Sequence, residues 1–316
     1  MPRALTESQL DHYRQHGYVF PVTALSADEV ERYGRGLDEH LQRARGVIRP
    51  AYKHKLHLVS RWADELVHHP SILDAVEDIL GPDILCWTTN LLVKEGGRAS
   101  YVSWHQDSGY WALEPHEVVT AWVALTPSTT ESGCVRVLPD SHLPEKNARH
   151  RDTFDKDNML TRGQELADEI NEQDAVDMEL AAGEISLHHI RLFHGSAANR
   201  SNDRRTGIAI RYMSSRVRKT KRPESAMLCR GQAGNGNFLP ESRPDGDFTT
   251  DARLCHNRAV RLQVANNYDP VGNEPAGTRL RLALERSMLT GFLDAYYAKW
   301  KLDQALGREP AQPAVY

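Results

Sequence analysis

The sequence predicts a mainly β fold with helical additions: a double-stranded β-helix core (jelly roll, cupin-like) buttressed by N- and C-terminal helices. Three observations support this fold class. Helical patterns fill the first quarter of the 316-residue chain, short strand-forming segments fill its middle, and a helical pattern returns at residues 278–306. Strand and helix units do not alternate, as a parallel α/β sheet would require. A length of 316 residues with 40% hydrophobic content allows one large domain or two small ones, and we expect one domain over residues 1–316 because all-β domains with helical additions often reach this size undivided.

Helix start and stop signals define the N-terminal region. Thr6 with Gln9, and Ser26 with Glu29, have the form of capping boxes, and Gly17 supplies a stop between them. Two further helical patterns follow, and a Gly-Pro pair ends the second of them. We therefore expect helices at residues 7–16, about 27–45, 61–68 and 71–80, with a strand at 18–22 and an ambiguous stretch at 46–60.

Segments rich in strand-forming residues dominate the middle of the chain. One of them alternates Ile208, Ile210 and Tyr212 with Ala209 and Arg211, which is the period of a β-strand. The expected strands are 84–94, 118–125, 134–138, 184–189 and 206–214, and they define a β core at about residues 84–215.

A charged stretch at about residues 141–180 interrupts these strands and shows no sustained alternation. We expect an excursion that is partly helical. Long insertions in compact sheet folds serve as active-site lids or as solvated surface loops, and the sequence favours neither alternative. A Gly-, Asn- and Pro-rich segment at 231–247 is expected to be a loop, and the apolar spacing of residues 278–306 indicates a C-terminal helix.

The charge balance argues against a nucleic-acid partner and against an anionic membrane surface, because the net charge is -4 and the pI is near 6.4. We interpret a basic run at residues 204–222 as a charged strand edge and loop. A site for nucleic acid or for an anionic substrate group is the alternative. Four cysteines without CxxC spacing, a polar N-terminus and the lack of 18 consecutive apolar residues favour a cytoplasmic protein without membrane spans.

The stretch WHQDSGYW at residues 104–111 supplies half of a metal site. In a β-strand, residues i and i+2 point to the same face, so His105 and Asp107 can approach one cation while Gln106 faces away. Two histidines and one carboxylate, with the remaining positions open, are the ligand set of non-heme Fe(II) oxygenases. The sequence should therefore supply a second histidine downstream.

The candidates for this second histidine are His188, His189 and His194. We favour His194 because hydroxyl, amide and guanidinium groups follow it, and such groups bind the carboxylate of an anionic cosubstrate. His188 and His189 are then expected to be core or pocket-lining residues. The groups that follow His194 belong to Ser196, Asn199, Ser201 and Arg205.

These two motifs, HxD at 105–107 and HGSxxNxSxxxR at 194–205, closely resemble the phytanoyl-CoA dioxygenase family of Fe(II)/2-oxoglutarate-dependent oxygenases, particularly its bacterial members. The likeness spans about residues 84–215. It includes AWVAL at 121–125, ESGCVRVLPDSH at 131–142 and AGEISLHH at 182–189.

The resemblance implies a site assembled around Fe(II), 2-oxoglutarate and O2. His105, Asp107 and His194 are implied to bind the iron. The residues implied to contact 2-oxoglutarate are Arg205 and Ser196, at its distal carboxylate, and Trp122 and Lys94, which match positions lining the same pocket.

The reaction that the resemblance implies is hydroxylation of an unactivated C–H bond of a small-molecule substrate, with release of succinate and CO2. Related halogenases carry a small residue at the position of Asp107, so its carboxylate argues against halogenation. Tyr110 and Trp111 are predicted to face the substrate. The alternatives are another oxidation by the same iron site (desaturation, epoxidation or ring formation), a non-catalytic jelly-roll protein that binds a carboxylate ligand, and a nucleic-acid-binding module, which is least favoured.

Overall fold

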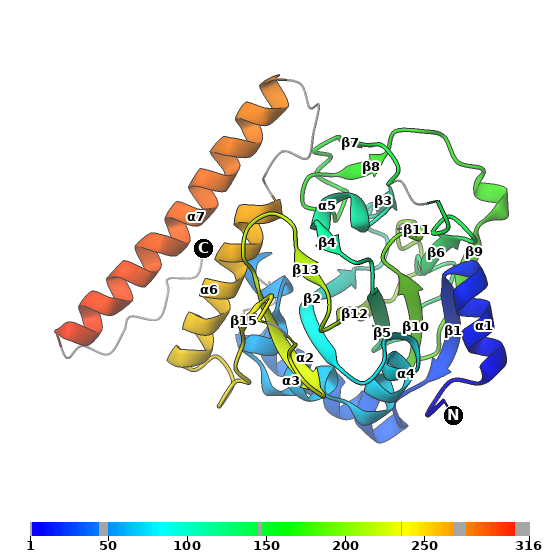
Figure 1. The fold of residues 1–316 in the computed structure, drawn as a ribbon, viewed down its shortest axis with the longest axis horizontal. Helices are drawn as coiled ribbons and strands as arrows, with labels where there is room; N and C mark the ends of the chain where they lie inside the picture. The colour runs from blue at the N-terminus through cyan, green and yellow to red at the C-terminus, as the bar shows by residue number, and fades with distance from the viewer. Residues whose placement is uncertain (1, 44–49, 145–146, 235, 268–275, 307–316) are drawn as a thin grey trace.

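Two β-sheets and a layer of helices form the body of the molecule in the computed structural model, which describes residues 2–43, 50–144, 147–234, 236–267 and 276–306 (Figure 1). The larger sheet has seven strands in the order β1-β10-β5-β12-β2-β14-β15, and only the β14–β15 pair is parallel. Its strands are β1 (Tyr18–Thr23), β2 (Ile84–Lys94), β5 (Val118–Ala124), β10 (Glu184–His189), β12 (Arg205–Ser214), β14 (Ser225–Arg230) and β15 (Leu239–Pro240).

The smaller sheet has four antiparallel strands in the order β3-β11-β6-β9. A buried cluster joins it to the inner face of the larger sheet, with Val135 and Val137 from one sheet and Trp122 and Ala209 from the other. The predicted jelly-roll core, with helices at both ends of the chain, is therefore confirmed. The strands of the smaller sheet are β3 (Val102–His105), β6 (Val135–Leu138), β9 (Val176–Met178) and β11 (Phe193–Ser196).

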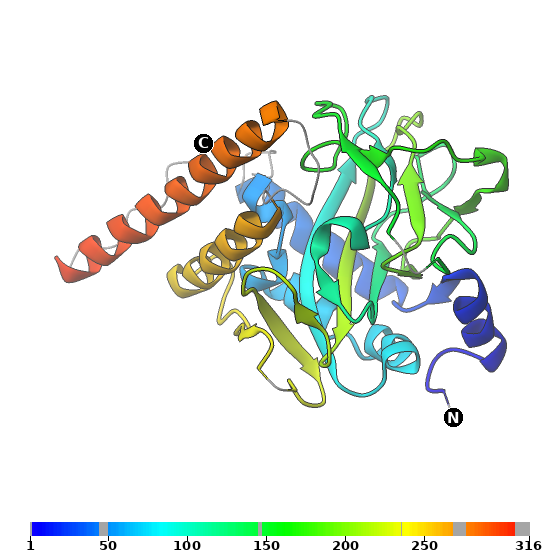
Figure 2. The same cartoon turned by 45° about the horizontal axis from the view of Figure 1, so that its top comes forward.

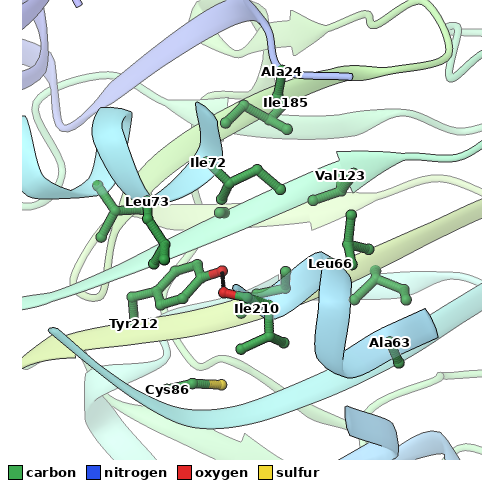
Figure 3. Packing of buried hydrophobic residues seen from close by; sticks show 14 of the residues in the cluster. Ala24, Ala63, Leu66, Ile72, Leu73, Cys86, Val123, Ile185, Ile210 and Tyr212 are labelled. Carbon is green, nitrogen blue, oxygen red and sulfur yellow. Dashed lines mark hydrogen bonds between the residues drawn. The ribbon is translucent and has the colours of Figure 1, made fainter. Parts of the chain in front are cut away.

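The outer face of the larger sheet packs against the N-terminal helices. Figure 3 shows Leu66 and Ile72 of these helices lying on Val123 and Ile210 of the sheet. The Tyr212 hydroxyl donates a hydrogen bond of 2.8 Å to the carbonyl of Val67, which satisfies the one polar atom that Tyr212 brings into this apolar layer. The helices are α1 (Glu7–His16), α2 (Ala27–Arg43), α3 (Arg61–Val67) and α4 (Pro70–Leu80).

Both predicted capping boxes are confirmed. The amide of Gln9 donates to the Thr6 hydroxyl at 3.2 Å, and the amide of Thr6 donates back to the Gln9 side chain at 2.8 Å. Ser26 and Glu29 repeat the arrangement at 3.3 and 2.8 Å. The end of the helix expected at about 27–45 lies outside the described residues, as does part of the ambiguous stretch. The described part of that stretch forms two 3-10 turns, η1 (Pro50–Lys53) and η2 (Leu56–Leu58).

All five predicted core strands are present, with bounds that differ from the expected ones by no more than one residue. The edge interpretation of the basic run is wrong, because β12 lies between β5 and β2 and is paired on both sides. Outside the centre of β12, the run is largely neutralised by acidic neighbours. Its ion pairs include Arg204–Glu95 at 3.0 Å, Arg216–Glu117 at 2.8 Å and Lys219–Glu224 at 2.7 Å.

The 141–180 excursion consists mostly of loops and turns with three short strands, so the expectation of helix there is met only by the 3-10 turn η3 (Glu172–Asp174) within its described residues. It contributes β9 to the smaller sheet and a separate pair, β7 (His150–Asp152) with β8 (Gln164–Leu166). Each of these strands has only three residues, which is too short for a readable alternation in the sequence.

The C-terminal helix is present as α7 (Ala276–Ala305), and an unpredicted helix, α6 (Thr250–Asn267), precedes it. Ala252 and Ala259 of α6 join the core beneath the larger sheet, whereas α7 packs along α6 and projects from the body (Figures 1 and 2). Leu280, Leu284 and Met288 are exposed on α7. The C-terminal buttress is therefore α6. No helix in the described part of the chain is long and apolar enough to cross a membrane.

Candidate metal centre

His105, Asp107 and His194 form a buried cluster whose potential ligand atoms all lie within 4.8 Å of one another. Antiparallel pairing of β3 with β11 places His105 directly opposite His194, and their ring centroids are 4.1 Å apart. The Nε2 atoms of His105 and His194 lie 3.4 and 3.9 Å from the two carboxylate oxygens of Asp107. The structure thus brings together the three residues that the motifs predicted.

Backbone carbonyls fix the orientation of both imidazoles. The Nδ1 atom of His105 lies 2.9 Å from the carbonyl of Ser103, and that of His194 lies 2.9 Å from the carbonyl of Leu192. A carbonyl only accepts hydrogen bonds, so each Nδ1 carries the proton. The lone pair of each Nε2 is then free for a metal, as is typical of histidine ligands with an ordered outer partner.

The prediction that His105 and Asp107 share one strand is wrong, because β3 ends at His105 and Asp107 lies beyond it. Asp107 has helical backbone angles (φ −61°, ψ −39°) and starts the short helix α5 (Ser108–Trp111). The side chain of Gln106 supports this turn, because its amide nitrogen donates to the carbonyl of Arg191 at 2.8 Å and its oxygen accepts from the amide of Ala148 at 2.9 Å. The turn carries the carboxylate back toward the histidines.

The electrostatics of the cluster suit a divalent cation. Burial disfavours the ionised form of Asp107, but the neighbouring His194 and His105 outweigh it and hold the pKa of Asp107 well below its usual range. Burial, and then the proximity of His105, lower the pKa of His194 to about 4, so this imidazole is neutral at pH 7. The Oδ2 atom of Asp107 is buried without a hydrogen-bond partner. An ionised carboxylate with an orphaned oxygen and a neutral imidazole fit Fe(II).

The guanidinium of Arg205 is a second charged feature, and it lines the same cavity as His105 and His194. Arg205 is 1% exposed, its guanidinium lies 4.9 Å from the ring of Trp122, and its Nε and Nη1 atoms have no hydrogen-bond partner. Burial lowers its pKa to about 10, which still leaves it charged at pH 7. A buried cation with unused donors is costly unless an anion fills the site, and the distal carboxylate of 2-oxoglutarate has the matching charge and shape.

Ser196 and Lys94 sit beside this cation but are already engaged. The Nζ atom of Lys94 donates to the hydroxyl of Ser196 at 2.5 Å and to its carbonyl at 3.1 Å, and the hydroxyl donates to the carbonyl of Gly133 at 2.7 Å. Burial, and then the charge of Arg205, lower the pKa of Lys94 to about 6. Asn199 and Ser201 hydrogen-bond within the turn between β11 and β12, so they shape the loop that ends at Arg205.

The cavity that contains both ligand histidines lies between the two sheets. Met159 and Leu160 of the 141–180 excursion line it, so part of that segment covers the site. Tyr110 and Trp111 are not among its lining residues: Tyr110 packs edge-on against His150 at 4.8 Å, and Trp111 lies 5.3 Å from the guanidinium of Arg211. The remaining lining residues are Leu92, Val102, His105, Thr120, Trp122, Val135, His188, His194, Gly195, Ser196, Arg205, Ala209 and Arg211.

His188, which was expected in the core or in a pocket lining, lines this cavity, whereas the sequence did not predict two other polar lining residues, Thr120 and Arg211. Arg211 was grouped with the surface cations of the basic run. Its position carried a usable signal, because it lies six residues after Arg205 on one strand and therefore on the same face. His188 precedes His194 by six residues with a turn between them, so no simple periodicity connects the two.

Gly207 allows Trp122 to lie flat beneath Arg205, because a Cβ atom at this position would be 2.2 Å from the indole Cζ2. We expect Gly207→Ala to displace the indole, weaken 2-oxoglutarate binding about tenfold and destabilise the fold by about 1–3 kcal/mol. Calorimetric titration and thermal unfolding check this. Gly34→Ala on α2, where nothing lies within 4 Å, is the matched control and should leave 2-oxoglutarate affinity unchanged. Unchanged affinity in Gly207→Ala would show that the indole does not position the guanidinium.

Comparison with known proteins agrees with this geometry. The sequence model of the family described as "Phytanoyl-CoA dioxygenase (PhyH)" matches residues 13–207. A probable alpha-ketoglutarate-dependent hypophosphite dioxygenase of Stutzerimonas stutzeri is 30% identical over 166 residues, which are 49% of this chain and 54% of that protein. The peroxisomal phytanoyl-CoA dioxygenase of Rattus norvegicus is 25% identical over 236 residues, covering 67% and 69% of the two chains. The first of these matches thus spans only about half of its relative.

A solved structure resembles nearly the whole chain. The non-heme monooxygenase ThoJ, in its apo form, is 35% identical, with a TM-score of 0.73 over 88% of this chain and 100% of that one. Its nickel complex is 36% identical, with a TM-score of 0.68 over 81% and 96% of the two chains. The family match covers more than half of the chain, and the ligand cluster and the buried guanidinium are both present. The chain therefore belongs to the phytanoyl-CoA dioxygenase (PhyH) family of Fe(II)/2-oxoglutarate-dependent oxygenases.

Proposed function

We propose that this enzyme hydroxylates an unactivated C–H bond of a small-molecule substrate, with conversion of 2-oxoglutarate and O2 to succinate and CO2. The observation that carries the proposal is one cavity lined by His105 and His194, beside Asp107, and by the unpartnered Arg205. Three protein ligands on one side leave coordination positions open for a cosubstrate and O2. Iron and 2-oxoglutarate, when bound, supply the oxidising chemistry, and the protein supplies orientation and exclusion of water.

The proposed roles of the chain's residues follow from their positions. His105, Asp107 and His194 hold the iron, and Arg205 pairs with the distal carboxylate of 2-oxoglutarate. Trp122 keeps the guanidinium in place from below. Ser196 and Lys94 reach this carboxylate if their present hydrogen bonds rearrange, because both lie next to Arg205.

The substrate is proposed to enter between the sheets beneath the 141–180 excursion, which then acts as a lid. Met159 and Leu160, with Leu92, Val102 and Val135, give this part of the cavity an apolar lining that suits a hydrocarbon portion of the substrate. Tyr110 and Trp111 of α5 remain predicted substrate contacts. We place the enzyme in the cytoplasm, which the four free cysteine thiols support.

The proposal is tested by incubating the Fe(II) enzyme with 2-oxoglutarate in air and measuring succinate. We expect slow succinate formation without substrate, which a chelator abolishes, and faster formation with a substrate that gains one oxygen atom by mass spectrometry. Loss of two hydrogen atoms instead would indicate desaturation or ring formation, and gain of an oxygen at a double bond would indicate epoxidation. Binding of 2-oxoglutarate without metal and without succinate formation would contradict an enzymatic role and favour the carboxylate-binding alternative.

A further inference from the structure

Four polar residues form a row across the inner face of the larger sheet. In the strand register, Arg211 of β12 lies opposite Thr120 of β5 and Thr88 of β2, and Thr120 lies opposite His188 of β10. Directly opposite residues of antiparallel strands share a face, so all four side chains stand on the side that faces the smaller sheet. We call His188, Thr120, Arg211 and Thr88 the polar row.

Every member of the polar row has a buried polar atom without a hydrogen-bond partner. These atoms are both ring nitrogens of His188, the hydroxyls of Thr120 and Thr88, and Nε of Arg211. His188, Thr120 and Thr88 are 2%, 1% and 2% exposed. More than about 90% of buried polar groups in folded proteins are satisfied, so four neighbouring exceptions are unusual. His188, Thr120 and Arg211 line the cavity that contains the ligand histidines, which makes it the place where a bound molecule can supply the missing partners.

Arg211 gives this row a positive charge. Its Nη1 atom donates to the side-chain oxygen of Asn90 at 2.5 Å and to the carbonyl of Ala209 at 3.2 Å, and its guanidinium lies 5.3 Å from the ring of Trp111. These contacts orient the guanidinium but do not neutralise it. Among the described residues, no carboxylate lies within ion-pair distance of Arg211, and the carboxylate whose charge acts on it, Asp107, belongs to the candidate metal cluster. Arg211 is only partly exposed, and its Nε atom is buried, so its charge is costly to hold there unless a ligand brings a counter-charge.

The charge balance of the occupied cavity defines that ligand. Fe(II) with the single carboxylate of Asp107 leaves one net positive charge, and Arg205 adds another. The two carboxylates of 2-oxoglutarate balance both. Arg211 lies six residues from Arg205, about 20 Å along the strand, and is left with one uncompensated charge. A carboxylate, with one negative charge and two coplanar oxygens, matches it better than a phosphate monoester, which carries about −1.5 to −2.

We propose that the polar row binds a carboxylate group of the primary substrate, with Arg211 as its ion-pair partner and Thr120 and His188 as hydrogen-bonding partners. This inference rests on the proposed function, because it places the substrate in the cavity beside the iron ligands. It narrows the substrate to a carboxylic acid, whose acid group is held at the polar row while an apolar portion contacts residues such as Leu160 and Val135.

The test measures binding of hexanoate and 3-phenylpropionate, and of their primary amides, to the anaerobic Fe(II) enzyme by calorimetry. Saturating 2-oxoglutarate keeps Arg205 occupied, so these probes report on Arg211. We expect at least one carboxylate to bind at least about tenfold more tightly than its amide, the size of a charge-assisted hydrogen-bond contribution. Arg211→Gln should reduce this ratio to about one and change the Kd of 2-oxoglutarate by no more than about twofold.

Three further variants make the result interpretable. Arg211→Lys keeps the charge and should retain part of the preference, even if Arg211→Gln folds poorly. Thr120→Val should weaken carboxylate binding several-fold without abolishing the preference. Arg216→Gln, at a 71% exposed arginine paired with Glu117, is the matched control and should change nothing.

A carboxylate preference that survives in Arg211→Gln, or wild-type enzyme that shows none, overturns the inference. Binding of inorganic phosphate is measured in the same way. Tighter binding of phosphate than of either carboxylate would also overturn the inference. Binding of 2-oxoglutarate is measured separately. If the wild-type protein does not bind 2-oxoglutarate, the result contradicts the proposed function. If it binds 2-oxoglutarate but shows no preference for carboxylates, the result contradicts only the inference on the polar row.

Discussion

Arg205→Met is expected to weaken 2-oxoglutarate binding at least about 100-fold while leaving Fe(II) binding unchanged. Truncating one partner of a buried, hydrogen-bonded charge pair costs about 2–5 kcal/mol, because the other charge is left without compensation. The Arg205 guanidinium is 1% exposed, so water cannot replace it at the distal carboxylate. Calorimetric titration of the anaerobic Fe(II) protein with 2-oxoglutarate measures this loss.

The neighbouring arginine supplies a matched control. Arg204 is an exposed residue whose Nε lies 3.0 Å from Glu95, so Arg204→Met should leave 2-oxoglutarate affinity unchanged. A second readout separates binding from folding. Without 2-oxoglutarate, Arg205→Met should be more stable than the wild type by about 1–4 kcal/mol, because an unpaired buried cation has been replaced by an apolar group. Loss of 2-oxoglutarate binding in Arg204→Met but not in Arg205→Met would show that the cosubstrate pairs with Arg204 instead.

Asp107→Asn is expected to weaken Fe(II) binding more than about 100-fold, because loss of an outer-shell partner alone costs about 10- to 100-fold and Asp107 is a proposed ligand itself. Asparagine keeps the shape of the side chain but removes its negative charge. Anaerobic Fe(II) titration followed by tryptophan fluorescence measures the affinity. Asp140→Asn, at a half-exposed aspartate 2.6 Å from His16 that does not belong to the cluster, is the control and should bind iron normally. Equal affinities in the two variants would remove Asp107 from the ligand set.

Local sequence signals were sufficient for much of the fold and for the metal ligands. The capping boxes at Thr6 and Ser26 were readable because their partners lie three residues away. The pairing of His105 with His194 was not local, yet each histidine sits in its own short motif. Those motifs, together with the family resemblance, predicted that both histidines are ligands, and the structure brings them together with Asp107.

The features of the site that the sequence did not predict depend on tertiary contacts. The HxD spacing placed Asp107 on a strand, but the backbone turns at Gln106, whose side chain binds segments remote in sequence. The charge of Arg211 predicts a surface cation, which is wrong. Its strand lies in the middle of the sheet, and the alternation with Ile208 and Ile210 turns it toward the cavity. Charge alone does not reveal which side of a sheet a residue occupies.

The most direct test of the central claim is anaerobic Fe(II) titration of the wild-type protein with 2-oxoglutarate, followed by visible absorption spectroscopy. The account predicts the weak charge-transfer band of an Fe(II)–2-oxoglutarate complex, and loss of this band in His105→Ala and His194→Ala. Circular dichroism should show that both variants keep their fold, because each substitution shortens a side chain that lines a cavity. A wild-type protein without the band, or variants in which it is unchanged, would contradict the assignment of the iron site.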